Sequence, residues 1–509
     1  MAYLLGIDLG TSSVKTILVS ESGTICGQGI GVYPLLIPHP GWAEQDPRDW
    51  WNAAVIAVRQ SLREITNRKD ILAIGLSGQM HGTVLLGKQD NLLYRAIIWP
   101  DQRSAKQVAE ITHLIGLQRL IEITGSSLAT GFQMASIRWL QQQESELWEQ
   151  VHKVLLPKDY LRWRMTGNFA TDPSDGSGTL MLDSQQREWS PLLMNSLQID
   201  PNLLPLIYPS ISVGGMLAPG VAAEMGLPGG IPVIIGAADT ASSLIGSGIT
   251  TAQDLLLTIS TGGQLVLPVT EFSVDHLGRM HTFCSALGNN PQESSWYLMS
   301  ATLSAGQSLR WLRENILVLG DGDAYQQLNN LAEGSPVGAN GLFFWPYLVG
   351  ERSPLMDPGA RGMFVGLNHR HTRADLVRAV MEGVTYSLYQ AFAVMSEVGF
   401  QPRRIVMVGG GSRSQLWQKM VANVFGFPVV SLRIAEQSAL GAALLAGAGI
   451  KLFQVSETCQ QWAQYAPPRE PNFKAHALYQ ESFALFQEIY RTYRTRSSFG
   501  SAPQVGNTS

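Results

Sequence analysis

The sequence predicts an α/β protein of two domains, and three observations carry that prediction. The chain has 509 residues, more than one hydrophobic core usually holds. Short apolar runs typical of strands alternate with segments whose apolar residues recur at helical spacing. A strand–turn–strand pattern opens the chain and returns about halfway along it, which indicates an internal duplication into two related domains.

The first strand–turn–strand pattern lies at the start of the chain. Apolar runs at residues 3–7 and 14–19 flank a turn that Asp8 precedes, and this spacing predicts a β-hairpin. Glycine and small hydroxyl residues make up the turn, namely Gly10, Thr11, Ser12 and Ser13.

Turns of this composition can bind phosphate, because their backbone N–H groups approach the oxygens closely and their hydroxyls add donors. A carboxylate at Asp8 would repel a phosphate chain unless a cation lay between them. Mg²⁺ fits that position, since it binds carboxylates, waters and phosphate oxygens. An ordinary polar turn over residues 8–12 is the alternative.

The second copy of the pattern lies near the middle of the chain. Apolar runs at residues 255–259 and 265–267 flank another small polar turn, which contains Ser260, Thr261, Gly262, Gly263 and Gln264. Two such turns, one in each domain, are able to clamp a triphosphate between the domains.

A predicted strand at residues 71–76 runs into a loop that contains Gln79, Met80 and His81. A polyol ligand needs several short hydrogen bonds, which glutamine and histidine side chains can supply. A histidine satisfied by neighbouring backbone is the alternative. Trp99, farther along, is expected in the core.

Asp239 follows a predicted buried strand at residues 232–235 and a small-residue stretch. Taken alone, it reads as a helix N-cap. A kinase, however, needs one carboxylate that orients and deprotonates the acceptor hydroxyl, and Asp239 is a candidate for that role.

A glycine cluster, Gly409, Gly410 and Gly411, follows a predicted strand at residues 405–408. Ser412 is expected to begin a helix, with Gln415 completing a capping box. A helix N-terminus of this kind can hold a nucleotide's ribose and α-phosphate. Tight strand–helix packing is the alternative, and neither the dinucleotide fingerprint nor the P-loop pattern is matched.

The bulk composition argues against several classes of function. The net charge is −4 and the sequence pI is about 6.2, so neither nucleic acid nor a membrane surface is an expected partner. Three scattered cysteines form neither a disulfide framework nor a metal-site spacing, which favours a reducing compartment. We see no signal peptide and no apolar stretch long enough to span a bilayer.

These segments together resemble the FGGY family of carbohydrate kinases, over nearly the whole chain. Residues 6–12 are similar to the family's opening phosphate hairpin, and residues 409–414 to its adenosine-binding loop. Residues 42–47 and 77–82 resemble the xylulokinase branch of the family, and residues 156–161 and 350–354 also fit. Residues 362–382 resemble the C-terminal signature.

The resemblance implies the two-domain fold of actin, hexokinase and the large heat-shock chaperones, with ribonuclease H-like domains and an interdomain cleft. It implies a sugar-binding domain at residues 1–248, a nucleotide-binding domain at 249–495 and a flexible tail at 496–509. It also implies a cytoplasmic enzyme, with a homodimer as a further expectation.

The resemblance implies an activity as well. The substrates would be MgATP and a ketopentose, with D-xylulose phosphorylated on its terminal hydroxyl. Asp239 is similar to the family's catalytic base, and Asp8 to the residue that manages Mg²⁺. Met80, His81, Gln79 and Thr240 would contact the sugar. The nucleotide would meet Gly10, Thr11, Ser12, Thr261, Gly262, Gly263, Gly409, Gly410, Gly411 and Ser412.

Several positions depart from the family pattern. Thr240 stands where xylulokinases commonly have Asn, and Ser136 where the family's first signature usually has Lys. The second phosphate turn reads Ser260-Thr261-Gly262 in place of Gly-Thr-Ser, and Pro100 replaces a frequent Asn. Another sugar, such as D-ribulose or a polyol, therefore stays open as the substrate. A nucleotide-driven clamp of the actin type, without sugar turnover, is the alternative from a different class.

Overall fold

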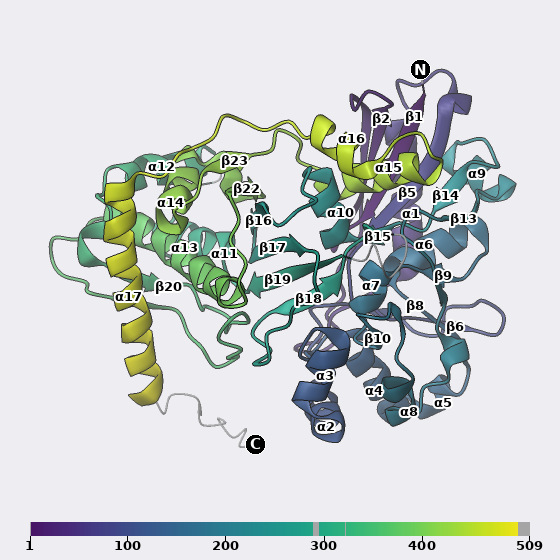
Figure 1. Cartoon of the computed structure of the whole chain (residues 1–509), viewed down its shortest axis with the longest axis horizontal. Helices are drawn as coiled ribbons and strands as arrows, with labels where there is room; N and C mark the ends of the chain where they lie inside the picture. The colour runs from purple at the N-terminus through teal and green to yellow at the C-terminus, as the bar shows by residue number, and fades with distance from the viewer. Residues whose placement is uncertain (1, 289–294, 321, 497–509) are drawn as a thin grey trace. The chain divides into compact units, whose positions relative to one another are not determined.

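The computed structural model describes residues 2–288, 295–320 and 322–496, which form two compact units (Figure 1). Unit 1 comprises Met1–Asp254, Val266–Met299 and Leu432–Gln464, and unit 2 comprises Leu255–Leu265, Ser300–Ser431 and Tyr465–Ser509. The chain thus enters each unit more than once. The assignment of sugar and nucleotide binding to two domains stays a prediction. The predicted tail at 496–509 lies outside the described residues, apart from Arg496 at the end of a helix.

A seven-stranded sheet forms the centre of unit 1, in the order β13-β14-β5-β1-β2-β3, with β15 also paired to β5. The strands are β1 (Tyr3–Leu9), β2 (Ser13–Ser20), β3 (Ile25–Val32), β5 (Ile71–Gly78), β13 (Val213–Met216), β14 (Pro232–Ile234) and β15 (Ala237–Ala238). Strands β1 and β2 pair antiparallel from Tyr3↔Ser20 to Leu9↔Val14, so the predicted hairpin is confirmed.

Three strands of this sheet end at one edge. Strands β1 and β5 are parallel with Leu9 opposite Gly78, and β15 is parallel to β5 with Ala238 opposite the same glycine. The residues at or just beyond the carboxyl ends of β1, β5 and β15 are therefore neighbours. This edge, called the catalytic edge below, brings together residues about 70 and 230 positions apart in sequence.

Glycines let two helices approach this sheet closely. Helix α1 (Pro47–Ser61) begins after Asp46, whose side chain accepts from the backbone N–H of Arg48 and so caps the helix. Helix α15 (Gln437–Gly449) lies against β1 and β5 (Figure 1), where a Cβ on Gly6 or Gly75 would come within 2.0 or 1.8 Å of its carbonyl oxygens. The Ala- and Gly-rich C-terminal segment is thus a packed internal helix.

The remaining elements of unit 1 surround the central sheet. The further helices are α2 (Ala105–Ile115), α3 (Leu117–Thr124), α4 (Gln133–Gln143), α5 (Ser145–Trp148), α6 (Pro157–Thr166), α7 (Pro173–Ser177), α8 (Pro191–Ser196), α9 (Pro219–Met225), α10 (Asp239–Gly246) and α16 (Val455–Trp462). The short strands are β4 (Glu44–Gln45), β6 (Val84–Gly87), β7 (Ala96–Ile97), β8 (Val151–Leu155), β9 (Ala170–Thr171), β10 (Leu182–Asp183), β11 (Glu188–Trp189), β12 (Leu206–Ile207) and β18 (His281–Cys284).

Unit 2 contains most of a second, mixed sheet. This six-stranded sheet follows the order β18-β19-β17-β16-β22-β23, and β20 pairs with β21. The strands are β16 (Asp254–Ile259), β17 (Gly263–Val269), β19 (Trp296–Thr302), β20 (Phe343–Trp345), β21 (Met363–Val365), β22 (Arg404–Val408) and β23 (Val429–Ser431). The helices are α11 (Gly306–Trp311), α12 (Ala324–Glu333), α13 (Arg373–Glu397), α14 (Gln415–Phe425) and α17 (Phe473–Arg496), with a π-helical turn at Leu312–Ile316.

The helix expected to begin at Ser412 begins later. Residues Gly410–Arg413 form a 3₁₀ turn, and helix α14 starts at Gln415 with Ser414 as its N-cap. The Ser414 hydroxyl accepts from the Trp417 N–H at 3.1 Å, so the capping box predicted for Ser412 and Gln415 is wrong. Gly426 ends the helix in a left-handed conformation, as predicted.

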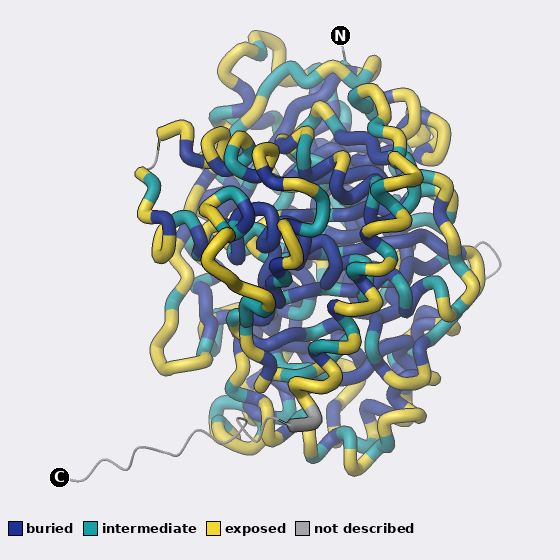
Figure 2. The backbone as a smooth tube through the Cα atoms, turned by 90° about the vertical axis from the view of Figure 1, so that its left-hand side faces the viewer, coloured by how far each residue is buried: buried dark blue, intermediate teal, exposed yellow. Residues whose placement is uncertain are grey.

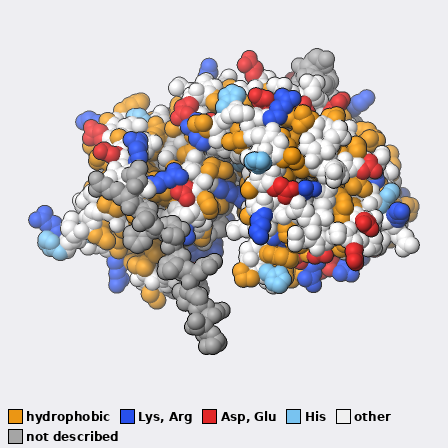
Figure 3. Space-filling view, turned by 90° about the horizontal axis from the view of Figure 1, so that it is seen from below, with side chains coloured by type: hydrophobic (Ala, Val, Ile, Leu, Met, Phe, Trp, Pro, Cys, Tyr) orange, Lys and Arg blue, Asp and Glu red, His pale blue; other side chains and the backbone are white. Residues whose placement is uncertain are grey.

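Buried chain fills the interior, and exposed chain lies on the outside (Figure 2). Strands β1, β2 and β5 with helix α1 supply nearly half of the buried residues of one apolar core in unit 1. On the face drawn in Figure 3, acidic and basic side chains are interspersed. Cys26, Cys284 and Cys459 are free thiols. No helix in the described part of the chain is long and apolar enough to cross a membrane.

Candidate active site

Two carboxylates meet at the catalytic edge of unit 1. Asp8 is the second-last residue of β1, opposite Ser77 of β5, and Asp239 directly follows β15. The Ser77 hydroxyl donates to Oδ1 of Asp8 at 3.0 Å. Both aspartates stay partly exposed, whereas the strands beneath them are buried. The structure thus brings together two of the residues that the sequence analysis predicted for catalysis.

The environment raises the pKa of both carboxyls. Burial is the main cause in each case, and it raises the pKa of Asp239 to about 6 and that of Asp8 to about 7. Hydrogen bonds from Thr240 partly offset the effect at Asp239, whereas the Asp239 charge adds to it at Asp8. Asp239 therefore loses its proton first, and its negative charge opposes ionisation of Asp8.

Asp239 is not a helix N-cap, so that alternative is wrong. Helix α10 begins at Asp239 itself, and its N-cap position is Ala238. The Thr240 N–H and hydroxyl both donate to Oδ1 of Asp239, at 2.6 and 3.2 Å. The Ser438 hydroxyl donates to the Asp239 carbonyl oxygen at 3.2 Å, which ties this turn to α15.

The first phosphate turn is held in shape by three side chains outside it. The Tyr33 hydroxyl donates to the Gly10 carbonyl, and the Gln45 amide donates to the Thr11 carbonyl at 2.6 Å. The Trp99 indole N–H donates to the Thr11 hydroxyl at 2.9 Å. Trp99 is only partly buried, so the expectation that it lies in the core is wrong.

Ser12, the third predicted member of this turn, is exposed, while Gly10 and Thr11 are partly exposed. With their carbonyl oxygens engaged by these donors, the turn's conformation is fixed before any ligand arrives. Such preorganisation reduces the conformational entropy lost on binding.

The loop after β5 places Gln79, Met80 and His81 beside the catalytic edge. Gln79 is buried, and its amide donates to Gln45 at 2.9 Å. The Oε1 of Gln79 has no hydrogen-bond partner among the described residues. The Met80 sulfur lies 3.8 Å from the Tyr297 hydroxyl.

His81 adopts a positive φ of 72°, which directs its ring away from the ordinary strand path. Its Nδ1 lies 2.6 Å from the Gly178 carbonyl, which can only accept, so Nδ1 carries the proton. In the neutral ring Nε2 then carries the lone pair, suited to accept from a hydroxyl. The alternative prediction was a histidine satisfied by neighbouring backbone. It holds in part, because one ring nitrogen bonds to a backbone carbonyl, but that carbonyl belongs to Gly178, which is distant in sequence.

The second turn lies in unit 2, where backbone contacts fix it against the start of α11. The Thr261 carbonyl accepts from the N–H groups of Ala305 and Gln307, at 2.9 and 3.1 Å. Thr261 is exposed and Gly262 is partly exposed. Gly263 is buried, and a Cβ there would lie 2.6 Å from Leu388, so packing alone requires that glycine.

The glycine cluster after β22 serves two purposes. Gly409 has a φ of +80° and Gly410 has open space at its Cβ position, and both are exposed. A Cβ on Gly411 would lie 2.6 Å from the Ile259 side chain, so this buried glycine allows close packing. The Ser412 hydroxyl donates back to the Gly409 carbonyl at 2.8 Å. Gly409 and Gly410 thus leave an accessible backbone surface.

A buried charge cluster was missed by the sequence analysis. Lys158 has no exposed surface and lies 2.7, 3.2 and 3.6 Å from carboxylate oxygens of Asp159, Asp172 and Asp175. Burial alone would lower the Lys158 pKa, but the three carboxylates raise it above its usual range. The pattern Thr-Asp-Pro-Ser-Asp at residues 171–175 was a signal, since a run so polar is seldom buried.

The fold and these glycine turns define a class of protein, the two-domain kinases with an actin-like ATPase fold. Family models confirm this class over most of the chain. The N-terminal domain of the FGGY family of carbohydrate kinases matches residues 3–246, and the C-terminal domain of that family matches residues 269–450. The chain belongs to the FGGY family of carbohydrate kinases.

Individual relatives agree with this assignment. A xylulose kinase from Bacillus subtilis is 37% identical over 96% of this chain and 97% of its own length. A gluconokinase from the same organism is 30% identical over 87% of each chain. The crystal structure of a xylulose kinase from Brucella ovis superposes with a TM-score of 0.90 at 32% identity, covering 97% of this chain and all of the other. The protein is thus a sugar kinase, and its substrates are a small sugar and ATP.

Proposed function

We propose that this kinase transfers the γ-phosphoryl group of ATP to the terminal hydroxyl of D-xylulose, which yields D-xylulose 5-phosphate. The observation that carries the proposal is the meeting of Asp8 and Asp239 beside the first glycine turn. The xylulose kinases with 33–37% identity over 96% of this chain support the choice of sugar.

Asp239 is the proposed general base. Its carboxylate is partly exposed, and its raised pKa of about 6 makes it a better proton acceptor than an ordinary aspartate while leaving it ionised at pH 7. Thr240 engages only Oδ1, so the carboxylate has a second oxygen for the sugar hydroxyl. Removing that proton as the phosphoryl group transfers strengthens the attacking oxygen.

Asp8 is the proposed partner of the magnesium ion that arrives with ATP. The residues fit a cation, because the Asp8 carboxyl is buried next to a second carboxylate and ionises reluctantly without one. One carboxylate, together with waters and phosphate oxygens, is a common Mg²⁺ environment. The ion would offset charge on the phosphoryl oxygens.

Backbone N–H groups and hydroxyls are proposed to hold the nucleotide. In unit 1 these belong to Gly10, Thr11 and Ser12. In unit 2 they belong to the turn Thr261, Gly262 and Gly263 and to the glycine cluster with its following serine, namely Gly409, Gly410, Gly411 and Ser412. Gly263 and Gly411 are buried, so we expect them to shape these loops and their neighbours to make the contacts.

The sugar is proposed to lie against Met80, His81 and Thr240. The buried Gln79 Oε1 offers a hydrogen-bond acceptor for a sugar hydroxyl. D-gluconate is a second candidate substrate, since a gluconokinase matches 87% of the chain at 30% identity. D-ribulose also stays open, because Thr240 departs from the xylulokinase pattern. The homodimer and the cytoplasmic location remain predictions from family resemblance.

A coupled assay of ADP release with MgATP tests the proposal on a panel of D-xylulose, D-ribulose, D-gluconate and glycerol. We expect the highest kcat/KM for D-xylulose. A higher kcat/KM for another sugar would leave the assignment as a sugar kinase intact but would change the proposed substrate. An ATPase that no sugar stimulates would support the nucleotide-clamp alternative.

Variants test the base. Asp239→Asn should reduce turnover on the preferred sugar to a small residual rate while MgATP still binds, because the amide cannot accept the hydroxyl proton. Asp90→Asn, at an exposed turn with a positive φ that asparagine tolerates, is the matched control and should retain wild-type turnover. Near-normal turnover by the Asp239 variant would disprove the assignment.

A further inference from the structure

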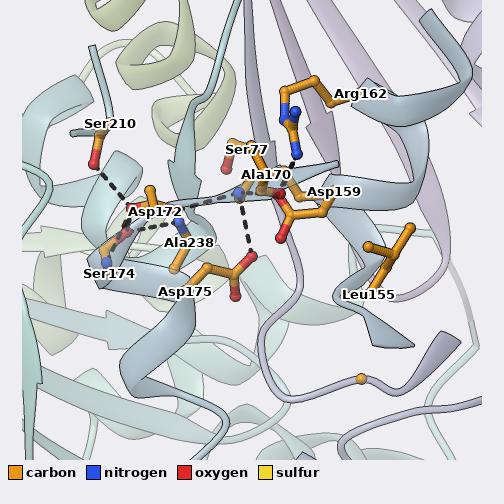
Figure 4. A network of polar contacts seen from close by, with 12 residues as sticks. Ser77, Leu155, Asp159, Arg162, Ala170, Asp172, Ser174, Asp175, Ser210 and Ala238 are labelled. Atoms are coloured by element: carbon orange, nitrogen blue, oxygen red, sulfur yellow. Dashed lines mark hydrogen bonds and ion pairs between the residues drawn. The ribbon is translucent and has the colours of Figure 1, made fainter. Parts of the chain in front are cut away.

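The buried charge cluster in unit 1 has a feature that packing does not require, namely a chain of hydrogen bonds that reaches the backbone N–H of Ala238, the residue before Asp239. Its members come from α6 and from the segment around α7, and Figure 4 shows the Asp159, Asp172 and Asp175 side chains placed around a common centre. A single lysine, Lys158, contacts all three carboxylates. Burying so many charges costs free energy, so a fold that needed only stability would be served as well by apolar side chains.

Asp172 collects the donors of this cluster. Its Oδ2 accepts from the Ser174 N–H at 2.9 Å, from the Ser174 hydroxyl and from the Ser210 hydroxyl at 2.9 Å (Figure 4). Its Oδ1 lies 3.2 Å from the Lys158 ammonium. The Ser174 hydroxyl is the donor in its bond to Asp172, so its hydrogen points to that carboxyl group.

The direction of this hydrogen bond decides whether Ser174 can act as an acceptor toward Ala238. Because the Ser174 hydroxyl donates to Asp172, its oxygen lone pairs are available, and it accepts the hydrogen bond from the Ala238 N–H at 3.0 Å. Ala238 is the last residue of β15 and the N-cap position of α10, and the next residue is Asp239. The hydrogen bond therefore fixes the Ala237–Ala238 peptide, which directly precedes Asp239.

The same cluster also meets the neighbouring strand. A Cβ on Gly78, the last residue of β5, would lie 3.0 Å from the Lys158 Cβ. Gly78 follows Ser77, whose hydroxyl donates to Asp8. The aliphatic part of Lys158 thus packs against the end of β5, whose Ser77 hydroxyl donates to Asp8. The Lys158 ammonium pairs with Asp172, which accepts from Ser174.

We propose that Lys158, Asp172 and Ser174 form a positioning relay that holds Asp239 in the geometry needed to take the sugar proton. Lys158 pairs with Asp172, Asp172 accepts the hydroxyl hydrogen of Ser174, and the Ser174 oxygen anchors the N–H of Ala238. These residues contact neither substrate nor the reacting atoms. The proposal rests on the proposed role of Asp239 as the base.

The chain offers a matched pair of variants for the test. Ser174→Ala removes a hydroxyl that bonds to both Asp172 and Ala238, whereas Ser210→Ala removes one that bonds to the same Asp172 oxygen but not to Ala238. Both serines are buried, so the two substitutions resemble each other in burial and in the Asp172 bond lost. A merely structural role predicts similar effects from both.

We expect Ser174→Ala to lower kcat by roughly 10- to 100-fold, because a small misplacement of a reacting group is enough for such a loss. KM for MgATP should change less than about twofold, and Ser210→Ala should leave kcat within about twofold of the wild type. Equal kcat losses in the two variants, or none in Ser174→Ala, would overturn the proposal. If circular dichroism shows Ser174→Ala unfolded, Ser174→Cys replaces it, since its weaker hydrogen bonds should give a smaller loss in the same direction.

A double-substitution cycle separates this inference from the proposed function. In the Asp239→Asn background, adding Ser174→Ala should change the residual turnover by less than about twofold, because the group it positions is already gone. A further loss as large as in the wild type would refute the relay. Normal turnover in Asp239→Asn alone would instead refute the base assignment, whatever Ser174 does.

Discussion

Replacing Asp8 with asparagine should make the protein more stable and less active. Asparagine keeps the shape of the side chain and an oxygen to accept the Ser77 hydroxyl, but it removes a carboxyl buried beside Asp239. Without nucleotide and magnesium, the Ser77 hydrogen bond and the Lys15 charge only partly compensate the ionised Asp8. The substitution thus removes a charge that the folded chain holds at a cost, for the benefit of binding MgATP.

The raised pKa of Asp8 sets the size and the pH dependence of the stability that its charge removes. The Asp8 pKa of about 7 lies above the ordinary 3.8, so between these values the folded state binds more protons than the unfolded one. Stability therefore falls as the pH rises from about 4 to about 7, and the penalty is complete above 7. Three pH units correspond to about 4 kcal/mol, and solvent screening of this partly exposed carboxyl reduces that to about 1–2 kcal/mol.

Scanning calorimetry of the nucleotide-free protein measures the effect. At pH 8, Asp8→Asn should raise the melting temperature of the transition assigned to unit 1 by about 2–4 °C. The increase should be smaller at pH 5, where the native carboxyl is already protonated. Asp90→Asn should shift neither value. An unchanged or lower melting temperature at pH 8, or an equal increase at both pH values, would refute the reasoning about Asp8.

Three further predictions follow from the same geometry. Because the Asp239 pKa is raised to about 6, kcat/KM should fall as the pH drops below about 6, and a pH profile that stays flat down to pH 5 would argue against this base. Lys158→Met should cost about 3–5 kcal/mol in urea unfolding, since Asp172 and Asp175 lose the cation that contacts them and Asp159 keeps only Arg162, and a loss under 1 kcal/mol would contradict this charge pairing. Gly75→Ala places a Cβ 1.8 Å from the Ala442 carbonyl oxygen and should destabilise the protein by about 1–3 kcal/mol. Gly220→Ala, which has no atom near the new Cβ, should not destabilise it. Equal stability of the two variants would show that α15 can shift away from the sheet at little cost.

Local sequence signals predicted the elements that depend on local physics. The hairpin of β1 and β2 follows from two apolar runs around a small polar turn, and the start of α1 follows from Asp46 and Pro47. The cap of α14 was misplaced because Ser412 and Ser414 are both good caps. The 3₁₀ turn at Gly410–Arg413 delays the start of the helix, so that Ser414 is the cap, and no local sequence pattern predicts that turn.

The site was predicted in its members but not in its connections. Asp8, the loop after β5 and Asp239 were each recognised as candidates from turn chemistry and family resemblance. Their meeting depends on β1, β5 and β15 ending at one edge, which is a property of strand order. The relay of Lys158, Asp172 and Ser174 escaped notice because its members join distant segments, and because burial of so many charges runs against the usual rule.

The identity of the product tests the central claim most directly. The protein would be incubated with MgATP and D-xylulose, and the phosphorylated product analysed by ³¹P and ¹³C nuclear magnetic resonance. The account predicts one phosphomonoester, on the terminal C5 oxygen, formed in step with ADP. Phosphorylation of another hydroxyl, or inorganic phosphate as the sole phosphorus product besides ADP, would contradict it.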